Sequence, residues 1–264
     1  MKLKDIQDEI SEIPLSLETV GIKDISFPII MLDKKNKKQH TVAKISMFAN
    51  LPAGKKGIHM SRFVEILNAN KEFVYFSSKK SFDVLKQIIK ALGCNKAQMN
   101  VEAPYFIEKI APLSKKSSVF KIDVGFLYTL SKNKKHKILT IKVPVTSLCP
   151  CSKEISKYGA HNQRSYVTLK IICKKFIWIE DLIKIIERNV SAPIYPLLKR
   201  IDEKYITEQA YEKPVFVEDI VRKIALNLIK LDCAKWFMVE SDNFESIHDH
   251  NAFAVFEWGE KDEI

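Results

Sequence analysis

The most informative stretch of this chain is Val119-Phe-Lys-Ile-Asp-Val-Gly-Phe-Leu-Tyr-Thr-Leu130, in which apolar side chains recur at every second position. That period is typical of an antiparallel strand with one buried face. The alternating residues are Phe120, Ile122, Val124 and Phe126. The segment Gln98–Ile110 before it is also extended in character, so we predict two neighbouring antiparallel strands.

Towards the N-terminus, two helical patterns and two further extended runs precede these strands. The extended runs cover 25–32 and 40–51. Apolar residues at helical spacing mark one helix over 60–67 and another over 81–92. We expect Ser81 to cap the second helix and Gly93 to end it in the left-handed conformation. The order is therefore ββααββ.

The same order recurs towards the C-terminus. Strands are predicted over 138–145, 166–173, 235–241 and 250–258, and helices over 179–186 and 217–231. In each half, this order of elements predicts an antiparallel sheet with helices on one face. The predicted fold class is therefore α+β. The basic turn Lys132–Lys137 is the expected seam, that is, the boundary between the two halves. The predicted organisation is an N-terminal extension (1–20), a first half (21–132) and a second half (133–264).

Composition limits the classes of protein. The chain has 264 residues, of which 46% are hydrophobic, so it has enough apolar surface for a sizeable core. A formal net charge of +11 favours an anionic partner. We see no signal peptide and no apolar stretch that could cross a bilayer. The 5 cysteines are irregularly spaced, which fits a reducing cytoplasm.

The segment Thr146–Ser165 has little periodicity and is longer than a hairpin needs, which is common for functional loops. Within it, Cys149, Cys151 and His161 offer soft ligands for an ion such as zinc. On spacing alone, a small buried thiol pair beside a capped loop is the favoured interpretation.

Other polar groups suggest chemistry without deciding it. In a strand, His248 and His250 would point to the same side, as metal ligands, as proton-transfer groups or as an exposed strand end. Glu218 is either an acidic first-turn residue or an anchor for a base with paired N–H donors. His59 and Arg62 could help to hold a phosphate, or could belong to an ordinary helix capped by Ser61.

Several motifs resemble those of the type IB GTP cyclohydrolases, over nearly the whole chain from Val20-Gly-Ile22 onward. The longest is Cys149-Pro-Cys-Ser-Lys-Glu-Ile-Ser-Lys-Tyr-Gly-Ala-His-Asn-Gln-Arg-Ser165. The shorter ones are Gly57-Ile-His-Met-Ser-Arg-Phe63, Asp202-Glu203-Lys204, Phe216-Val-Glu-Asp219 and Glu245-Ser-Ile-His248. Ile58 stands where threonine is expected in the family, a small departure.

The resemblance implies conversion of GTP and water to 7,8-dihydroneopterin triphosphate and formate, the entry step to tetrahydrofolate. It implies the tunnelling fold, tandem ββααββ units whose barrel is completed by oligomerisation. It further implies a homotetramer with active sites between subunits, and one divalent metal per site, Zn²⁺ or Mn²⁺ with Fe²⁺ as a further option. No nucleic-acid or membrane partner is expected.

The resemblance also implies roles for individual residues. Cys149 matches the family's catalytically important metal ligand, and His161 and Glu203 match the other expected ligands. Glu218 matches the glutamate that anchors guanine. The remaining assignments are Glu245, His248 and His250 near the metal and substrate, Cys151 just outside the ligand shell, and His59, Arg62 and Arg164 as candidates for holding the triphosphate.

Three other functions stay open at this point. An archaeal relative makes a cyclic phosphate product and prefers iron. A nitrile reductase of the same fold uses a nucleophilic cysteine and NADPH, but its Glu-Ser-Lys-Ser-type motif is not in this chain. A basic RNA-binding protein without enzymatic activity is the third, although no aromatic platform for RNA is recognisable.

Overall fold

The computed structural model describes residues 6, 7, 9–70, 78–132 and 134–260. The first five residues and residue 8 of the predicted N-terminal extension lie outside this part. Nine strands form one antiparallel sheet in the described residues: β1 (Leu17–Asp33), β2 (Lys37–Leu51), β3 (Lys96–Ile110), β4 (Ser117–Ser131), β5 (Lys134–Leu148), β6 (Asn162–Cys173), β7 (Ala192–Pro193), β8 (Ala234–Asn243) and β9 (Ala252–Gly259).

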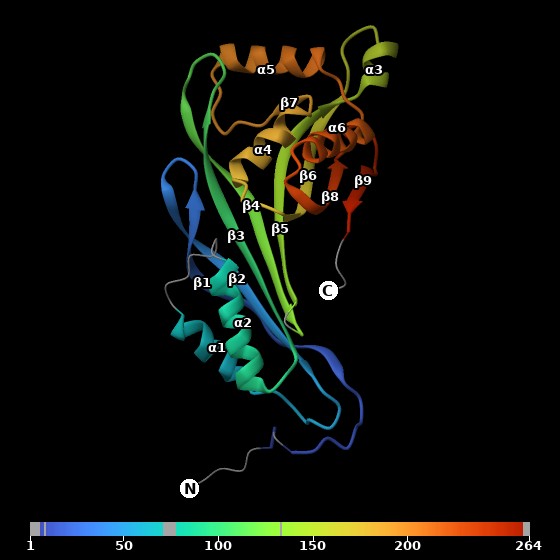
Figure 1. Ribbon diagram of the computed structural model, residues 1–264. Helices are drawn as coiled ribbons and strands as arrows, with labels where there is room; N and C mark the ends of the chain where they lie inside the picture. The colour runs from blue at the N-terminus through green and yellow to red at the C-terminus, as the bar shows by residue number, and fades with distance from the viewer. Residues whose placement is uncertain (1–5, 8, 71–77, 133, 261–264) are drawn as a thin grey trace. The chain divides into compact units, whose positions relative to one another are not determined.

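The strand order is β1-β2-β3-β4-β5-β6-β8-β9, and the short β7 pairs with β5. The helices are α1 (Met60–Ala69), α2 (Ser78–Leu92), α3 (Pro150–Ile155), α4 (Ile179–Arg188), α5 (Arg200–Glu212) and α6 (Val217–Lys230) (Figure 1). The chain divides into two compact units, described separately below. The first contains 1–103 and 125–138, and the second contains 104–124 and 139–261.

The first unit has its core between the sheet and two helices. Alternate residues of β2, among them Ile45 and Met47, are fully buried on the face that α1 and α2 cover. Phe63 of α1 and Leu85 of α2 are fully buried with them. Gly93 ends α2 with φ +61°, as predicted, since this conformation is costly for residues with a Cβ.

The second unit repeats this arrangement with α4 and α6. Val167 and Leu169 of β6 are fully buried, as is Val239 of β8. The facing helices bury apolar stripes that include Leu182 and Ile224. Helix α6 packs against β8 and β9 and contacts α4 (Figure 1). The predicted antiparallel α+β architecture is therefore confirmed in each unit.

Several local predictions were wrong. Ser81 is not the cap of α2, because the helix begins at Ser78 and Ser81 is buried inside it. Strand β1 begins at Leu17, earlier than the predicted residue 25. Helices α3 and α5 were not predicted. The expected seam falls at the β4–β5 turn, but β5 already starts at Lys134, inside the segment predicted to be a turn. None of the helices among the described residues has the length and apolar character needed to span a membrane.

Candidate active site

The segment Thr146–Ser165 folds back on itself around α3. Cys149 is the N-cap of α3, and its Sγ accepts a hydrogen bond from Ser152 N at 3.5 Å. The backbone N–H of Cys149 donates to the His161 carbonyl at 3.1 Å. Ser152 Oγ in turn accepts from His161 N at 3.2 Å. These bonds place Cys149 and His161 side by side. Cys151, on the first turn of α3, is exposed.

At one end of β5, β6 and β8, the buried face of the sheet changes from apolar to polar. The register pairs Ser147 of β5 with Gln163 of β6, and Ser165 of β6 with Asn243 of β8. Paired residues share a face of the sheet. We call this set, together with Ser241, the buried polar cluster, because each member is at most 8% exposed. Buried polar groups at a strand end are costly unless they are hydrogen-bonded, and so they suggest a site.

Within this cluster, Gln163 is the member that contacts both His161 and Glu245. His161 Nδ1 lies 3.0 Å from Gln163 Oε1 and 3.6 Å from Glu245 Oε2. Gln163 Nε2 donates to Glu245 Oε1 at 3.2 Å and to Ser147 Oγ at 2.9 Å. The His161 and Glu245 side chains are only 13% and 12% exposed. Gln163 was not singled out from the sequence, since nothing in its spacing distinguishes it from a structural strand residue.

Helix α6 starts next to this loop and brings Glu218 with it. Val215 N donates to the Leu148 carbonyl at 3.1 Å, and Leu148 N donates to Ser191 Oγ at 3.0 Å. Glu218 is exposed in the first turn of α6, as predicted, where the helix dipole favours a carboxylate. Its neighbour Asp219 is already paired with Arg222 at 3.1 Å. The exposed Glu218 carboxylate can therefore accept hydrogen bonds from a ligand.

Glu203 lies on a different segment, the first turn of α5, where it is exposed. The preceding residue, Asp202, is fully buried and accepts hydrogen bonds from Leu113 N, Ser114 N and Lys199 N at 2.8–2.9 Å. Burial raises the pKa of the Asp202 carboxyl, but hydrogen bonding by the Ser114 side chain and by these three backbone N–H groups outweighs burial and holds the pKa well below its usual range. Asp202 thus fixes the start of α5 to the β3–β4 turn and sets the position of Glu203.

The two histidines of the last motif do not lie in a strand, which corrects our prediction. They lie in the turn between β8 and β9, because β9 begins at Ala252. Their rings nevertheless stack, with centroids 5.0 Å apart and planes 15° from parallel. His250 Nδ1 also lies 3.3 Å from Asp249 Oδ1. Both His248 and His250 are exposed, so a substrate could reach them.

The three predicted triphosphate contacts are more scattered. In the first unit, His59 is the N-cap of α1, which corrects the expected Ser61 cap. Arg62 Nη1 donates to the Ala91 carbonyl, so its guanidinium caps the C-terminal end of α2. Arg164 is exposed on β6, on the face opposite Gln163 and Ser165. Their roles towards a substrate stay predictions.

Metal ligands are not assembled into a full set within the part of the chain that the structure describes. There, no three His, Cys, Asp or Glu side chains converge closely enough to hold an ion. Cys149 and His161 are neighbours, whereas Glu203 stands on α5. The chemistry of the donors nevertheless suits Zn²⁺ or Mn²⁺, since His161 engages Nδ1 within the chain and its Nε2 is a nitrogen that such an ion could use.

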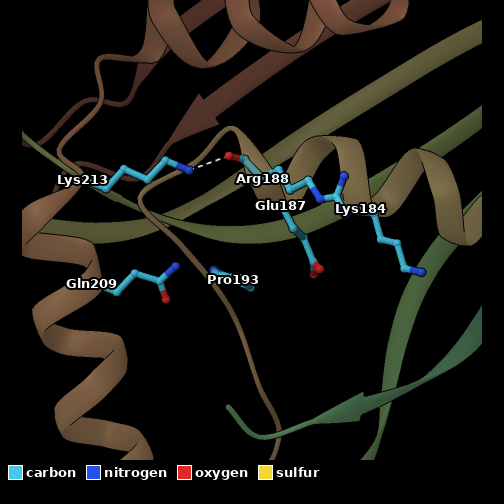
Figure 2. A pocket seen from close by; sticks show the side chains of 6 residues that line it. All are labelled: Lys184, Glu187, Arg188, Pro193, Gln209 and Lys213. Atoms are coloured by element: carbon cyan, nitrogen blue, oxygen red, sulfur yellow. Dashed lines mark hydrogen bonds between the residues drawn. The ribbon is translucent and has the colours of Figure 1, made fainter. Parts of the chain in front are cut away.

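A separate cavity of about 310 Å³ in the second unit is lined by Lys184, Glu187, Arg188, Pro193, Gln209 and Lys213 (Figure 2). Lys213 Nζ donates to the Arg188 carbonyl, which caps the C-terminal end of α4. Glu187 pairs with the buried Lys109. The first contact joins α4 to the segment between α5 and α6, and the second joins α4 to β3. The lining includes no predicted site residue.

Comparison with known structures identifies the fold. A urate oxidase from Bacillus sp. TB-90 matches with a TM-score of 0.57 and 9% identity, over 93% of this chain and 100% of that one. A uricase from Arthrobacter globiformis matches with a TM-score of 0.53 and 5% identity, over 96% and 97%. At such identities the likeness shows the fold alone, and it confirms the expected tunnelling fold.

Comparison of sequences is far more specific. The family model for type I GTP cyclohydrolase FolE2 matches residues 3–254. The GTP cyclohydrolase FolE2 of Geobacter metallireducens is 48% identical over 259 residues, covering 98% of each chain. That of Geobacter sulfurreducens is 48% identical over 255 residues, covering 97% of this chain and 98% of its own. The chain therefore belongs to the type I GTP cyclohydrolase FolE2 family.

Proposed function

We propose that this chain converts GTP and water to 7,8-dihydroneopterin triphosphate and formate, the first step of tetrahydrofolate synthesis. The observation that carries the proposal is the arrangement of Cys149, His161 and Glu245, in a chain that matches the family model over residues 3–254. The nitrile reductase, archaeal and RNA-binding alternatives have no comparable observation in their favour.

Cys149 and His161 would hold a divalent metal, Zn²⁺ or Mn²⁺ with Fe²⁺ as a further option, with Glu203 as the third ligand. A mixed thiolate, imidazole and carboxylate set accommodates both the softer and the harder of these ions. When bound, such an ion supplies a water acidic enough to attack C8 of guanine near neutral pH. This matters because C8 is a poor electrophile.

The chain's own residues would bind the substrate and move protons. Glu218 would accept from the paired N–H groups of guanine, a charge-assisted and bidentate contact that orients the ring. His248, stacked on His250, would protonate N7 and later assist the departure of formate. Glu245 would keep the imidazole of His161 in place. His59, Arg62 and Arg164 are the candidates for the triphosphate, to which the net charge of +11 is suited.

The working assembly would be a homotetramer in the cytoplasm, with its active sites between subunits. Two observations support a shared site. Glu203 does not converge with Cys149 and His161 within the described residues of one chain. Strand β9 ends the sheet and exposes the side chains of Phe253 and Val255 by 56% and 52%, and an uncovered edge strand offers its backbone N–H and C=O groups to another chain.

The test is formate and oxidised pterin release from GTP by chelated enzyme reloaded with Zn²⁺ or Mn²⁺. The variant Cys149→Ala removes the thiolate, and Cys151→Ala is the matched control two residues away. We expect metal-dependent turnover that Cys149→Ala abolishes and Cys151→Ala largely keeps. A folded tetramer without turnover under any metal would overturn the proposal.

A further inference from the structure

We infer that Gln163 is a positioning residue that fixes the tautomer of His161, with the proton on Nδ1 and the lone pair on Nε2. The inference deepens the proposed function and rests on it for the role of Nε2 as a metal ligand. It rests on the described contacts alone for the tautomer. No motif role was assigned to Gln163 from the sequence.

The direction of each hydrogen bond follows from what the groups can donate. An ionised carboxylate only accepts, so the end of the Gln163 amide at Glu245 Oε1, 3.2 Å away, must be the NH₂ group. The same NH₂ lies 2.9 Å from Ser147 Oγ, which can accept. Both NH₂ hydrogens then have acceptors. The other end of the amide is consequently the carbonyl oxygen.

That carbonyl oxygen lies 3.0 Å from His161 Nδ1. Because an amide oxygen can only accept, Nδ1 must carry the proton in the neutral imidazole. Glu245 Oε2 at 3.6 Å from the same nitrogen favours the same arrangement. Nε2 is then left without a proton, which is the form that coordinates a metal.

The amide is held in this orientation by the sheet. Gln163 is 8% exposed on β6, directly opposite Ser147 of β5. Ser147 Oγ is itself 2.9 Å from Ser165 Oγ, and both serines are fully buried. A flip of the amide would set its oxygen against the Glu245 carboxylate, and both of these groups can only accept hydrogen bonds. The register of β5 and β6 therefore maintains the tautomer before any ligand arrives.

The first measurement uses metal-free, full-length protein labelled with ¹⁵N in its histidines. Solid-state ¹⁵N shifts distinguish a protonated from a bare ring nitrogen, and His161→Gln assigns the signals. We expect wild-type His161 to carry its proton on Nδ1. A proton on Nε2 instead would overturn the inference, and this result does not depend on how any variant of Gln163 folds.

The second measurement compares Gln163→Leu with Ser241→Ala. Ser241 belongs to the same buried polar cluster, and its hydroxyl contacts Asn243 rather than His161 or Glu245. For folded Gln163→Leu we expect mixed tautomers and Zn²⁺ affinity lower by about 10- to 100-fold in competition with a chelating dye. Ser241→Ala should keep both properties. Unchanged tautomer and affinity in Gln163→Leu would overturn the inference, whereas a wild-type enzyme inert towards GTP would count against the proposed function alone.

Discussion

The backbone N–H of Val215 donates to the carbonyl oxygen of Leu148 over 3.1 Å, and this bond attaches the start of α6 to the residue before Cys149. One peptide later, the N–H of Cys149 donates to the His161 carbonyl. These two bonds therefore bring the segments that carry Glu218, Cys149 and His161 to one end of the second unit.

Glu218→Gln should weaken GTP use without affecting folding. A glutamine offers one acceptor and one NH₂, so one of the two contacts to guanine becomes repulsive. A hydrogen bond to a charged group contributes about 1.5–3 kcal/mol, which predicts a fall in kcat/KM of about 10- to 100-fold. Steady-state kinetics should show the loss mainly in KM, since the contact is made before and during the reaction.

The matched control for Glu218 is Asp219→Asn, one residue along the same helical turn. Asp219 already pairs with Arg222 on the surface, where such pairs contribute little. We expect its kcat/KM to stay close to wild type. Equal losses in the two variants would mean that the first turn of α6 acts through its charge, and that Glu218 is not the anchor.

Asp202→Asn should lower the thermal stability of the protein. The Asp202 Oδ1 atom accepts from Leu113 N and Ser114 N, and Oδ2 accepts from Lys199 N. An asparagine must turn its NH₂ towards one of these donors, so a buried N–H loses its partner. Calorimetry should show a Tm several degrees lower, whereas Asp123→Asn, in an exposed pair with Lys121, should leave Tm unchanged. An unaltered Tm for Asp202→Asn would show that α5 is held by other contacts.

The buried pair of Lys109 and Glu187 predicts a non-additive effect on stability. Their side chains are 7% and 15% exposed, and Lys109 Nζ also lies 4.7 Å from the centre of the Tyr195 ring. Burial lowers the pKa of Lys109, and Glu187 partly offsets this. Lys109→Met alone leaves a poorly solvated carboxylate, so we expect a loss of about 3–5 kcal/mol in the free energy of unfolding.

Adding Glu187→Leu to Lys109→Met should restore most of that loss, because an apolar pair of similar volume needs no charge compensation. Denaturant unfolding of the two single variants and the double variant measures the coupling. Strictly additive losses would contradict this account and would indicate that Glu187 remains solvated in the adjoining cavity.

How far the sequence predicts this structure depends on how strongly each element is patterned. The central strands and α4 have long apolar periods, so their predicted bounds lie within a few residues of the bounds in the structure. Helix α5 was missed because it buries only Asp202 and Ala210, so it has almost no apolar stripe. Available signals were its acidic first turn and the proline that follows its end. The N-terminal part of β1 was missed for a similar reason, since most of its residues from Leu17 to Asp24 are not buried.

The site was predictable only where its residues are unusual in type. Cys149, His161, Glu218 and Glu245 stood out as thiol, imidazole and carboxylate groups, and the structure brings them to one end of the second unit. Gln163 and Ser147 are ordinary strand residues until the β5–β6 register pairs them. The turn of His248 and His250 was mistaken for a strand, because a short polar segment before β9 has no period to mark its boundary.

The most direct test of the central claim follows the fate of carbon 8 of GTP. With metal-loaded enzyme and [8-¹³C]GTP, ¹³C NMR should show the label moving to formate, in equal amount to a dihydroneopterin that keeps its linear triphosphate in the ³¹P spectrum. A label that stays in the purine would contradict GTP cyclohydrolase activity. Labelled formate beside a cyclic phosphate would contradict the product proposed for this chain.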